Sequence, residues 1–326
     1  MLGFVVRRLL VSLLVMLVAS MLVFTMVASL GDPLAELKNR QPPPPASVIQ
    51  NRREELNLDK PIISRYFIWL GGFVRGDMGE DNRSREVYPR LKRALFITLR
   101  MVILATLLAL ALAVLVGVYS AVRQYSVGDY IATFTGFLFL STPVFWLAAL
   151  LKEYAAIRIN NLFDTTLVYT VGAESPNLSG SFFERWADYL GHLALPTLAL
   201  ALISFAAWSR YQRATMLDVL NSDYVRLARA KGLSNRRVLV RHALRNALIP
   251  LTTVVAIDFA AVFGGAVITE RVFAWQGMGT LLVEGVRLYD PNIVLAWLMV
   301  TGVIVILFNL LADILYGVLD PRIRFS

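Results

Sequence analysis

The sequence has no cysteine and only two histidines among its 326 residues. Without cysteine the chain can form no disulfide and has no thiolate to act as nucleophile or metal ligand. The two histidines, His192 and His242, are too few for a histidine-rich metal site. Charged residues are also scarce, at 17%, against about 25% in soluble domains. These shortages exclude a disulfide-stabilised secreted domain and a thiol enzyme, and they argue against one large soluble core.

Several catalytic signatures are missing as well. The chain has no G-x-x-x-x-G-K-[ST] phosphate loop, so any ATP that drives its function is hydrolysed on another chain. It also lacks a serine nucleophile elbow and a helix with metal-ligand spacing. We therefore expect a protein that is not an enzyme and binds no cofactor itself, and an intramembrane enzyme is a disfavoured alternative.

Apolar residues are abundant instead, at 57%, with a mean hydropathy of +0.61. They gather in runs of about 20 residues, the length that crosses a ~30 Å hydrocarbon core. The sequence thus predicts an all-α integral membrane protein with six transmembrane helices, of which the third is kinked by Pro143. We divide the chain into a first helix with its N-terminus (1–30), an extracytoplasmic loop region (31–93) and a transmembrane core (94–326). The expected spans are 9–30, 94–122, 130–151, 192–208, 248–273 and 293–319.

The charge distribution sets the orientation of these helices. The net charge is +9, which in a soluble protein would suggest nucleic acid. Here the densest positive charge lies in one loop, 209–247, and such loops stay on the cytoplasmic side. Both termini are then cytoplasmic. Lys92 and Arg93, which would lie on the outer side, are the one conflict with this orientation. We expect no nucleic-acid partner. The basic residues of this stretch are Arg210, Arg213, Arg226, Arg229, Lys231, Arg236, Arg237, Arg241 and Arg245.

The basic loop contains the start and stop signals of two short helices. Asn221, Ser222 or Asp223 can cap a helix over 224–231, and Gly232 suits its left-handed stop. Ser234 can cap a second helix over 235–247, with Pro250 in the opening turn of the fifth span. Small residues, Ala228 and Ala230, allow close approach by a partner surface. The alternative is a stop-transfer loop whose arginines bind lipid headgroups, and the residues alone leave both interpretations open.

Four residues of the fifth span are candidates for the translocation pathway. Asp258 lies near mid-bilayer, where a charge is expensive, so it either lines the substrate route or bonds to a partner subunit. Gly264 and Gly265 more often indicate close helix packing than a hinge. Glu270 and the nearby Arg100 of the second span are expected at the outer interface, where they can snorkel. An ion-coupled secondary transporter that uses Asp258 is the alternative function.

Several segments resemble the permease subunits of ABC importers. The resemblance is carried by 223–226, 228–233 and 241–250 in the basic loop, by Gly31-Asp32-Pro33 after the first span, and by 269–273. It extends over nearly the whole chain and is closest to the dipeptide, oligopeptide and nickel importers, specifically to the first of their two paired permeases. The basic loop departs from the general importer pattern, because Arg226 stands nearest the usual glutamate.

The resemblance implies a six-helix type I importer fold in the inner (cytoplasmic) membrane of a bacterium. It implies a second homologous permease, two ABC ATPase subunits that carry ATP and Mg²⁺, an extracytoplasmic substrate-binding protein and surrounding lipid as partners. The substrate would be a peptide or a similar solute, which the binding protein selects. The coupling helix that docks on the ATPase would comprise Tyr224, Arg226, Ala228, Arg229, Ala230, Lys231, Gly232 and Leu233.

Overall fold

The protein, represented by a computed structural model, is described over residues 2–176 and 179–319, without the side-chain surroundings of 2, 4, 265 and 315–319. It divides into two compact units. The first comprises Met1–Ile97 and Gln276–Ile306, and the second comprises Thr98–Trp275 and Leu307–Ser326. The arginines expected to close the chain inside, Arg322 and Arg324, lie outside the described residues.

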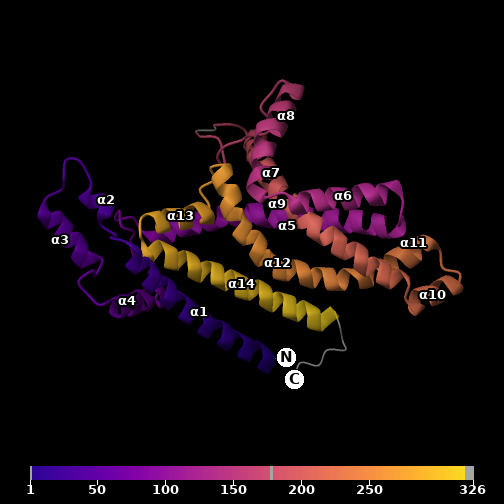
Figure 1. Cartoon of the computed structure of the whole chain (residues 1–326), viewed down its shortest axis with the longest axis horizontal. Coiled ribbons are helices and arrows are strands. Elements are labelled where there is room, and N and C mark those ends of the chain that lie inside the picture. The colour runs from indigo at the N-terminus through magenta and orange to yellow at the C-terminus, as the bar shows by residue number, and fades with distance from the viewer. Residues whose placement is uncertain (1, 177–178, 320–326) are drawn as a thin grey trace. The chain divides into compact units, whose positions relative to one another are not determined.

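The regular structure of the described residues is helical, apart from one bridge between Glu80 and Glu86 (Figure 1). Two π-helical turns, η1 and η2, interrupt the α-helices. The elements are α1 (Leu2–Leu30), α2 (Ala35–Lys38), α3 (Ala46–Glu55), α4 (Ile62–Val74), α5 (Val87–Val122), α6 (Val127–Ser141), α7 (Val144–Leu150), η1 (Leu151–Ala155), α8 (Ala156–Phe163), α9 (Phe182–Leu220), α10 (Asp223–Ala230), α11 (Asn235–Arg237), η2 (Val238–Leu244), α12 (Arg245–Val272), α13 (Met278–Arg287) and α14 (Pro291–Leu319).

The prediction of an all-helical membrane protein is confirmed. Among the described residues, five helices are long and apolar enough to cross a membrane, and a bent pair, α6 with α7–α8, would make a sixth. The helices extend beyond the predicted spans, most of all α9, which has 39 residues. Hydropathy marks only the apolar part of a helix, whereas its polar ends continue as long as backbone hydrogen bonds are made.

The third span is the largest departure from the sequence prediction. A single kinked helix over 130–151 was expected, but the chain breaks between α6 and α7 with a bend of 108°. Thr142 is extended, with ψ of 122°, as the residue before a proline tends to be. Its hydroxyl and that of Ser141 both donate to the carbonyl of Leu138, which ends α6. Local capping therefore turns the expected kink at Pro143 into a corner.

In the first unit, α1, α4 and α14 pack around an aromatic cluster. Phe24, Tyr66, Trp69, Leu295 and Met299 are all buried there. The segment expected to be an outer loop is thus folded, and its amphipathic piece over 62–73 is the helix α4.

A buried carboxylate holds the segment between α4 and α5. Asp81 has no exposed surface and accepts hydrogen bonds from the guanidinium groups of Arg85, at 2.7 Å, and Arg90, at 2.6 Å. Both arginines also bond to Glu284 of α13, at 2.9 and 2.6 Å. Each charge has an opposite partner, which is the condition for burying ions without a large penalty.

Asp290, just before α14, gives the first unit a pH-dependent stability. Burial, together with the charge of Asp81, raises the pKa of Asp290 to about 6. Because the folded protein retains a proton that the unfolded chain releases near pH 4, the free energy of unfolding falls as pH rises from about 4 to about 6. We expect Asp290→Asn to remove this slope, worth about 3 kcal/mol. Thermal unfolding from pH 4.5 to 7 would measure it, and equal slopes for both proteins would contradict it.

In the second unit, α9 packs closely against α5, α6 and α12. The carboxylate of Asp129 on α6 receives two hydrogen bonds of 2.8 Å from the guanidinium of Arg213 on α9. Asp129 also accepts from the backbone N–H of Tyr125 at 2.9 Å. Asp129 and Arg213 are 84 residues apart in the sequence, so this bidentate pair joins two helices that are distant along the chain.

The contact between α5 and α9 depends on Gly117. A Cβ at this position would lie 2.8 Å from the backbone oxygen of Ser209 and 2.8 Å from Cβ of Gln212. Because backbone cannot move aside cheaply, we expect Gly117→Ala to destabilise the protein by about 1–3 kcal/mol. Thermal unfolding in detergent would measure this loss. Gly264→Ala is the matched control, since no atom lies within 4 Å of its added Cβ, and equal losses in both variants would contradict the prediction.

Candidate functional site

Capping residues define both ends of the helix α10. Ser222 has the extended backbone of an N-cap, and Asp223 places a negative charge in the first turn. At the other end, Gly232 has a φ of +76°. The N–H of Gly232 bonds to the carbonyl of Arg229 and that of Leu233 to the carbonyl of Ala228, which together form a Schellman stop. The predicted glycine corner is therefore confirmed in its geometry.

One face of α10 packs against the rest of its own unit. Val225 and Ala228 are buried in a cluster with Met216 of α9 and with Val238 and Ala243 of η2. The interpretation that Ala228 offers a small surface to a partner was wrong, because only 5% of this residue is exposed. Its small size instead lets α10 pack closely on the helices beneath it.

The opposite face of α10 is free in the described chain. Tyr224 is 44% exposed and Leu227 is 56% exposed, and Ala230 lies on the surface as well. Leu227 was missed by the sequence analysis, although its spacing of three from Tyr224 places both on one side of a helix. The remaining residues of the predicted coupling set that lie on the surface are Arg226, Arg229, Lys231 and Gly232, whereas Leu233 is half-buried.

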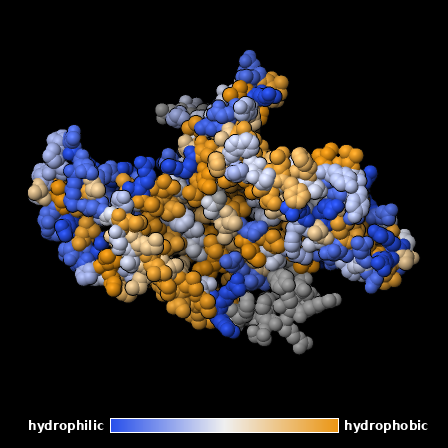
Figure 2. All heavy atoms as spheres, viewed as in Figure 1, coloured by the Kyte–Doolittle hydropathy of each residue, from blue (hydrophilic) through white to orange (hydrophobic). Residues whose placement is uncertain are grey.

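Charge surrounds this exposed apolar pair. Figure 2 shows mostly hydrophilic residues over α10 and α11. The carboxylate of Asp223 lies 3.6 Å from the guanidinium of Arg226, with both side chains largely exposed, so the pair contributes little stability. Arg236, Arg237 and Arg241 are exposed along the next helical segment. An apolar pair with a basic rim suits a protein surface that carries acidic residues around an apolar groove.

The second half of the basic loop does not form a separate helix. The predicted helix over 235–247 continues through η2 into α12, so that 235–272 is one helical run. Pro250 was expected in an opening turn but lies inside α12. A proline cannot donate a hydrogen bond one turn back, and membrane helices tolerate this where neighbouring groups compensate. The loop is thus one short helix, one corner and the start of a long helix (Figure 1).

Asp258 of α12 already has a partner within this chain. The indole N–H of Trp208 on α9 donates to its carboxylate at 2.8 Å. Trp208 is only 1% exposed, so this bond fixes the side of α12 on which the carboxylate lies. The sequence analysis offered either a substrate-facing carboxylate or a bond to a partner subunit, whereas this bond joins two helices of the same chain and leaves both interpretations untested.

The other three pathway candidates on α12 have different surroundings. Glu270 has no exposed surface and accepts a hydrogen bond from the hydroxyl of Thr98, so the expectation that it snorkels was wrong. Arg100 lies over the rings of Tyr189, at 4.6 Å, and Trp275, at 5.1 Å, and is half-buried. Gly264 faces open space, which contradicts close packing within this chain. Gly265 lies outside the described surroundings. The four candidates therefore do not form one lining.

Two family models match this chain. One, "Binding-protein-dependent transport system inner membrane component", matches residues 113–325 and so includes α10 and α12. The other, the N-terminal part of the same kind of membrane component, matches residues 1–92. The chain belongs to this family of permeases. As the membrane component of a binding-protein-dependent ABC importer, the permease is a transport subunit and not an enzyme.

The relatives of the permease are similar over their whole length. It is 41% identical over 323 residues to the oligopeptide transport system permease protein OppB of Mycobacterium tuberculosis, covering 99% of each chain. It is 36% identical to the oligopeptide permease AppB of Bacillus subtilis, again over 99% of each chain. It is 32% identical to the dipeptide permease DppB of Escherichia coli over 99% of each chain.

A solved structure has the same kind of fold. The inward-facing methionine ABC transporter MetNI matches with a TM-score of 0.54 and 15% identity, over 71% of the permease and 96% of that chain. At this identity the likeness shows the fold alone.

Proposed function

We propose that this permease forms half of the translocation pathway for peptides or similar solutes and that α10 couples it to separate ATPase subunits. The observation that carries the coupling role is the two-sided packing of α10. One side is fixed to α9 and η2, and the other presents Tyr224 and Leu227 to solvent. A force on the exposed side therefore reaches the long helices directly. Peptides are proposed because the relatives, at 32–41% identity, are named as peptide permeases.

The proposed assembly contains two homologous permeases, two ATPases and an extracytoplasmic binding protein. ATP and Mg²⁺ are placed on the ATPases, since this sequence has no phosphate loop. The proposed location is the cytoplasmic membrane of a bacterium, with six spans and both termini inside. The basic residues around α10 favour this orientation. We keep the proposed division of the chain into 1–30, 31–93 and 94–326, with 209–247 as the coupling region.

Within the coupling region we now assign two roles. Tyr224, Arg226, Arg229, Ala230 and Lys231 are proposed to contact the ATPase, together with the newly found Leu227. Ala228, Gly232 and Leu233 are proposed to shape and anchor the helix, because two of them pack inward and one forms the corner.

We also assign different roles to the proposed translocation residues on α12. Asp258 stays the candidate nearest a substrate route, because it is only half-buried and keeps one carboxylate oxygen beyond its bond to Trp208. Glu270 is proposed to act indirectly, by holding α12 against α5 through Thr98. Gly264, which faces outward, is proposed to meet the second permease.

Co-purification tests the assembly. A tagged permease expressed with its neighbouring transport genes should bring down one copy of a second permease and two ATPase subunits, and Leu227→Glu should release only the ATPases. Arg75→Glu, exposed and far along the sequence from α10, is the matched control. Recovery of the permease alone, together with uptake that needs a proton gradient and is lost in Asp258→Asn, would replace this proposal by the ion-coupled alternative.

A further inference from the structure

The helix α4 is too short to cross a membrane, although most of its residues are apolar. Its 13 residues extend over about 20 Å, against about 30 Å for the hydrocarbon core. Charged residues flank it on both sides, with Asp59 and Lys60 before it and Arg75 and Asp77 after it. A short apolar helix of this kind is either buried in a protein core or lies in the surface of a membrane. The exposure of its side chains distinguishes these two cases.

One side of α4 is an apolar stripe that the described part of the chain leaves uncovered. Ile63, Phe67 and Val74 are each more than half exposed, and Leu70 between them is partly exposed. Their spacing of four, three and four residues places all four on one side of the helix. The cluster shared with α1 and α14 covers a different side, which carries Tyr66. A contiguous exposed apolar patch indicates contact with another protein or with lipid.

The contacts of Tyr66 show at which level α4 lies along α1. Its ring packs edge-on against Phe24, with 5.7 Å between the centroids. Its hydroxyl lies 2.9 Å from that of Ser20 and donates to the carbonyl of Leu17 at 3.3 Å. Since α1 ends at Leu30, Phe24 is about 9 Å and Ser20 about 15 Å from that end. α1 is long and apolar enough to span a membrane, so α4 lies beside its hydrocarbon-spanning part and not beyond it.

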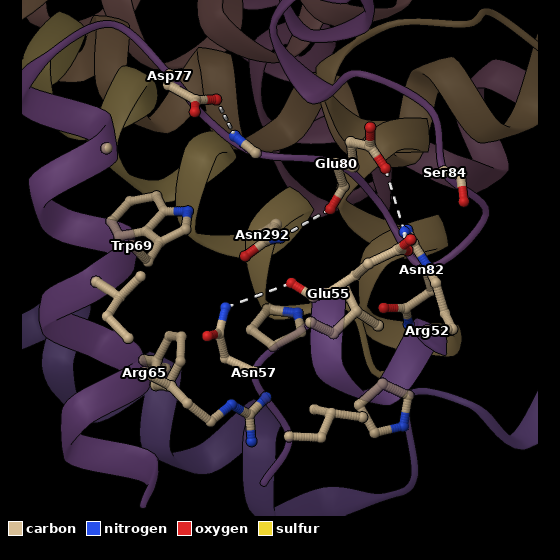
Figure 3. A pocket seen from close by; sticks show the side chains of 18 residues that line it. Arg52, Glu55, Asn57, Arg65, Trp69, Asp77, Glu80, Asn82, Ser84 and Asn292 are labelled. Atoms are coloured by element: carbon tan, nitrogen blue, oxygen red, sulfur yellow. Dashed lines mark hydrogen bonds and ion pairs between the residues drawn. The ribbon is translucent and has the colours of Figure 1, made fainter. Parts of the chain in front are cut away.

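The side of α4 opposite the stripe is polar and points toward the end of α1. Arg65, two residues from two members of the stripe, borders a pocket of about 680 Å³ whose wall also includes Pro33, three residues beyond α1. Arg52, Glu55 and Glu80 line the same pocket (Figure 3), and both glutamate side chains are more than half exposed. The polar side therefore faces water, whereas the stripe points along α1 toward the middle of the membrane.

Lipid acyl chains fit the stripe better than a protein surface does. Its four side chains carry no hydrogen-bond donor or acceptor, and a protein interface combines an apolar centre with polar groups at its rim. Leu22 and Met26 of α1, two residues on either side of Phe24, are more than half exposed at the same level. The stripe thus continues the apolar surface that a membrane-spanning helix presents to lipid.

We propose that α4 lies in the plane of the membrane, inside the leaflet that holds the C-terminal end of α1. The stripe contacts lipid acyl chains, and the pocket opens to headgroups and water. With both termini cytoplasmic this leaflet is the outer one, but the position of α4 does not depend on that orientation. Part of the segment 31–93, expected to be an extracytoplasmic loop, is then embedded in lipid and holds α2 and α3 at the membrane surface.

Fluorescence quenching in the complete importer tests this position. The permease has no cysteine, so Phe67→Cys carries a single bimane label on the stripe once any cysteines of the other subunits are replaced. Nanodiscs of phosphatidylcholine with brominated acyl chains should quench this label about twofold or more, because interfacial helices insert their apolar side about 5–10 Å deep. Iodide in the water should leave it unquenched.

Two labelled variants calibrate the measurement. Leu22→Cys on the membrane-spanning α1 should respond as Phe67→Cys does. Val48→Cys, an exposed apolar position on the polar helix α3, should be quenched by iodide and not by brominated lipid.

Two results would overturn the proposal. Quenching of Phe67→Cys by iodide alone would place α4 in water, and quenching by neither agent would indicate that another subunit covers the stripe. Ile63→Cys repeats the measurement if thermal unfolding shows that Phe67→Cys is not folded. ATP-driven uptake is measured separately in unlabelled wild-type complexes, so failure here leaves the transport function intact.

Discussion

Replacing Gly232 by valine is expected to reduce ATP-driven uptake at least tenfold while ATP hydrolysis by the complex continues. Gly232 has a φ of +76°, and no atom lies within 4 Å of an added Cβ. The penalty therefore arises from the backbone and not from a clash within the chain. A left-handed conformation costs about 1–2 kcal/mol for an ordinary residue and more for a β-branched one. A shift of 1.4 kcal/mol changes an equilibrium tenfold, enough to rotate the corner away from its working position.

Two control variants distinguish the backbone requirement at Gly232 from other causes of reduced uptake. Gly232→Asn should retain most uptake, because asparagine adopts positive φ more readily than other residues. Gly76→Val meets the same backbone penalty, with φ of +86° and open space, but lies outside the coupling region, so coupling should stay intact. The measurement is uptake and ATP hydrolysis in the same proteoliposomes. Wild-type uptake by Gly232→Val would contradict the coupling role, and an equal defect in Gly232→Asn would indicate a contact surface instead of a backbone requirement.

Loss of Asp129 is expected to destabilise the permease by about 3 kcal/mol, the low end of the cost of removing one partner from a buried ion pair, because Arg213 is only partly buried. Asp129 is 3% exposed, and its carboxylate holds both the guanidinium of Arg213 and the N–H of Tyr125. The Arg213 side chain is 27% exposed, so water compensates only part of the lost contact. Thermal unfolding in detergent should show a large drop for Asp129→Ala and a smaller drop for Asp129→Asn.

The matched comparison is the exposed pair on α10. Asp223 lies three residues from Arg226, but its side chain is fully exposed, so Asp223→Ala should leave the unfolding temperature unchanged. A double variant, Asp129→Asn with Arg213→Gln, should recover part of the loss, because no unpaired charge remains. If Asp129→Ala and Asp223→Ala are equally stable, or if the double variant is as unstable as the sum of its parts, the pair does not hold α6 to α9.

Features fixed by one residue or one run were predictable from the sequence. Apolar length predicted the long helices, and the glycine corner at Gly232 followed from a single residue whose conformation few others adopt. The exposed side of α10 could also have been found from the spacing of Tyr224 and Leu227. The predictions that failed concerned features that depend on contacts with residues far away in the sequence.

Burial is the clearest case of such distant dependence. Glu270 near the end of a span looked suited to an interface, but the hydroxyl that accommodates it, that of Thr98, is 172 residues earlier. Ala228 is small enough for either side of α10, and only the cluster with Met216 and Ala243 decides which side is buried. The bend at Pro143 was predictable as a kink, but the packing of both α6 and α7 on the distant helix α9 was not. The pocket of the first unit likewise needs segments separated by more than 200 residues.

The unusual length of α9 has a mechanical consequence. Its 39 residues form a rod of about 58 Å, nearly twice the ~30 Å hydrocarbon thickness. A rotation of about 5° around its midpoint would displace each end by about 2.5 Å. In the proposed coupling role, a force applied at α10 would act on this long lever arm, and the corner between α6 and α7 would be the nearest break in the neighbouring helices. If α10 docks as proposed, a small movement of this short helix would be enlarged along α9 at the far end of the same unit.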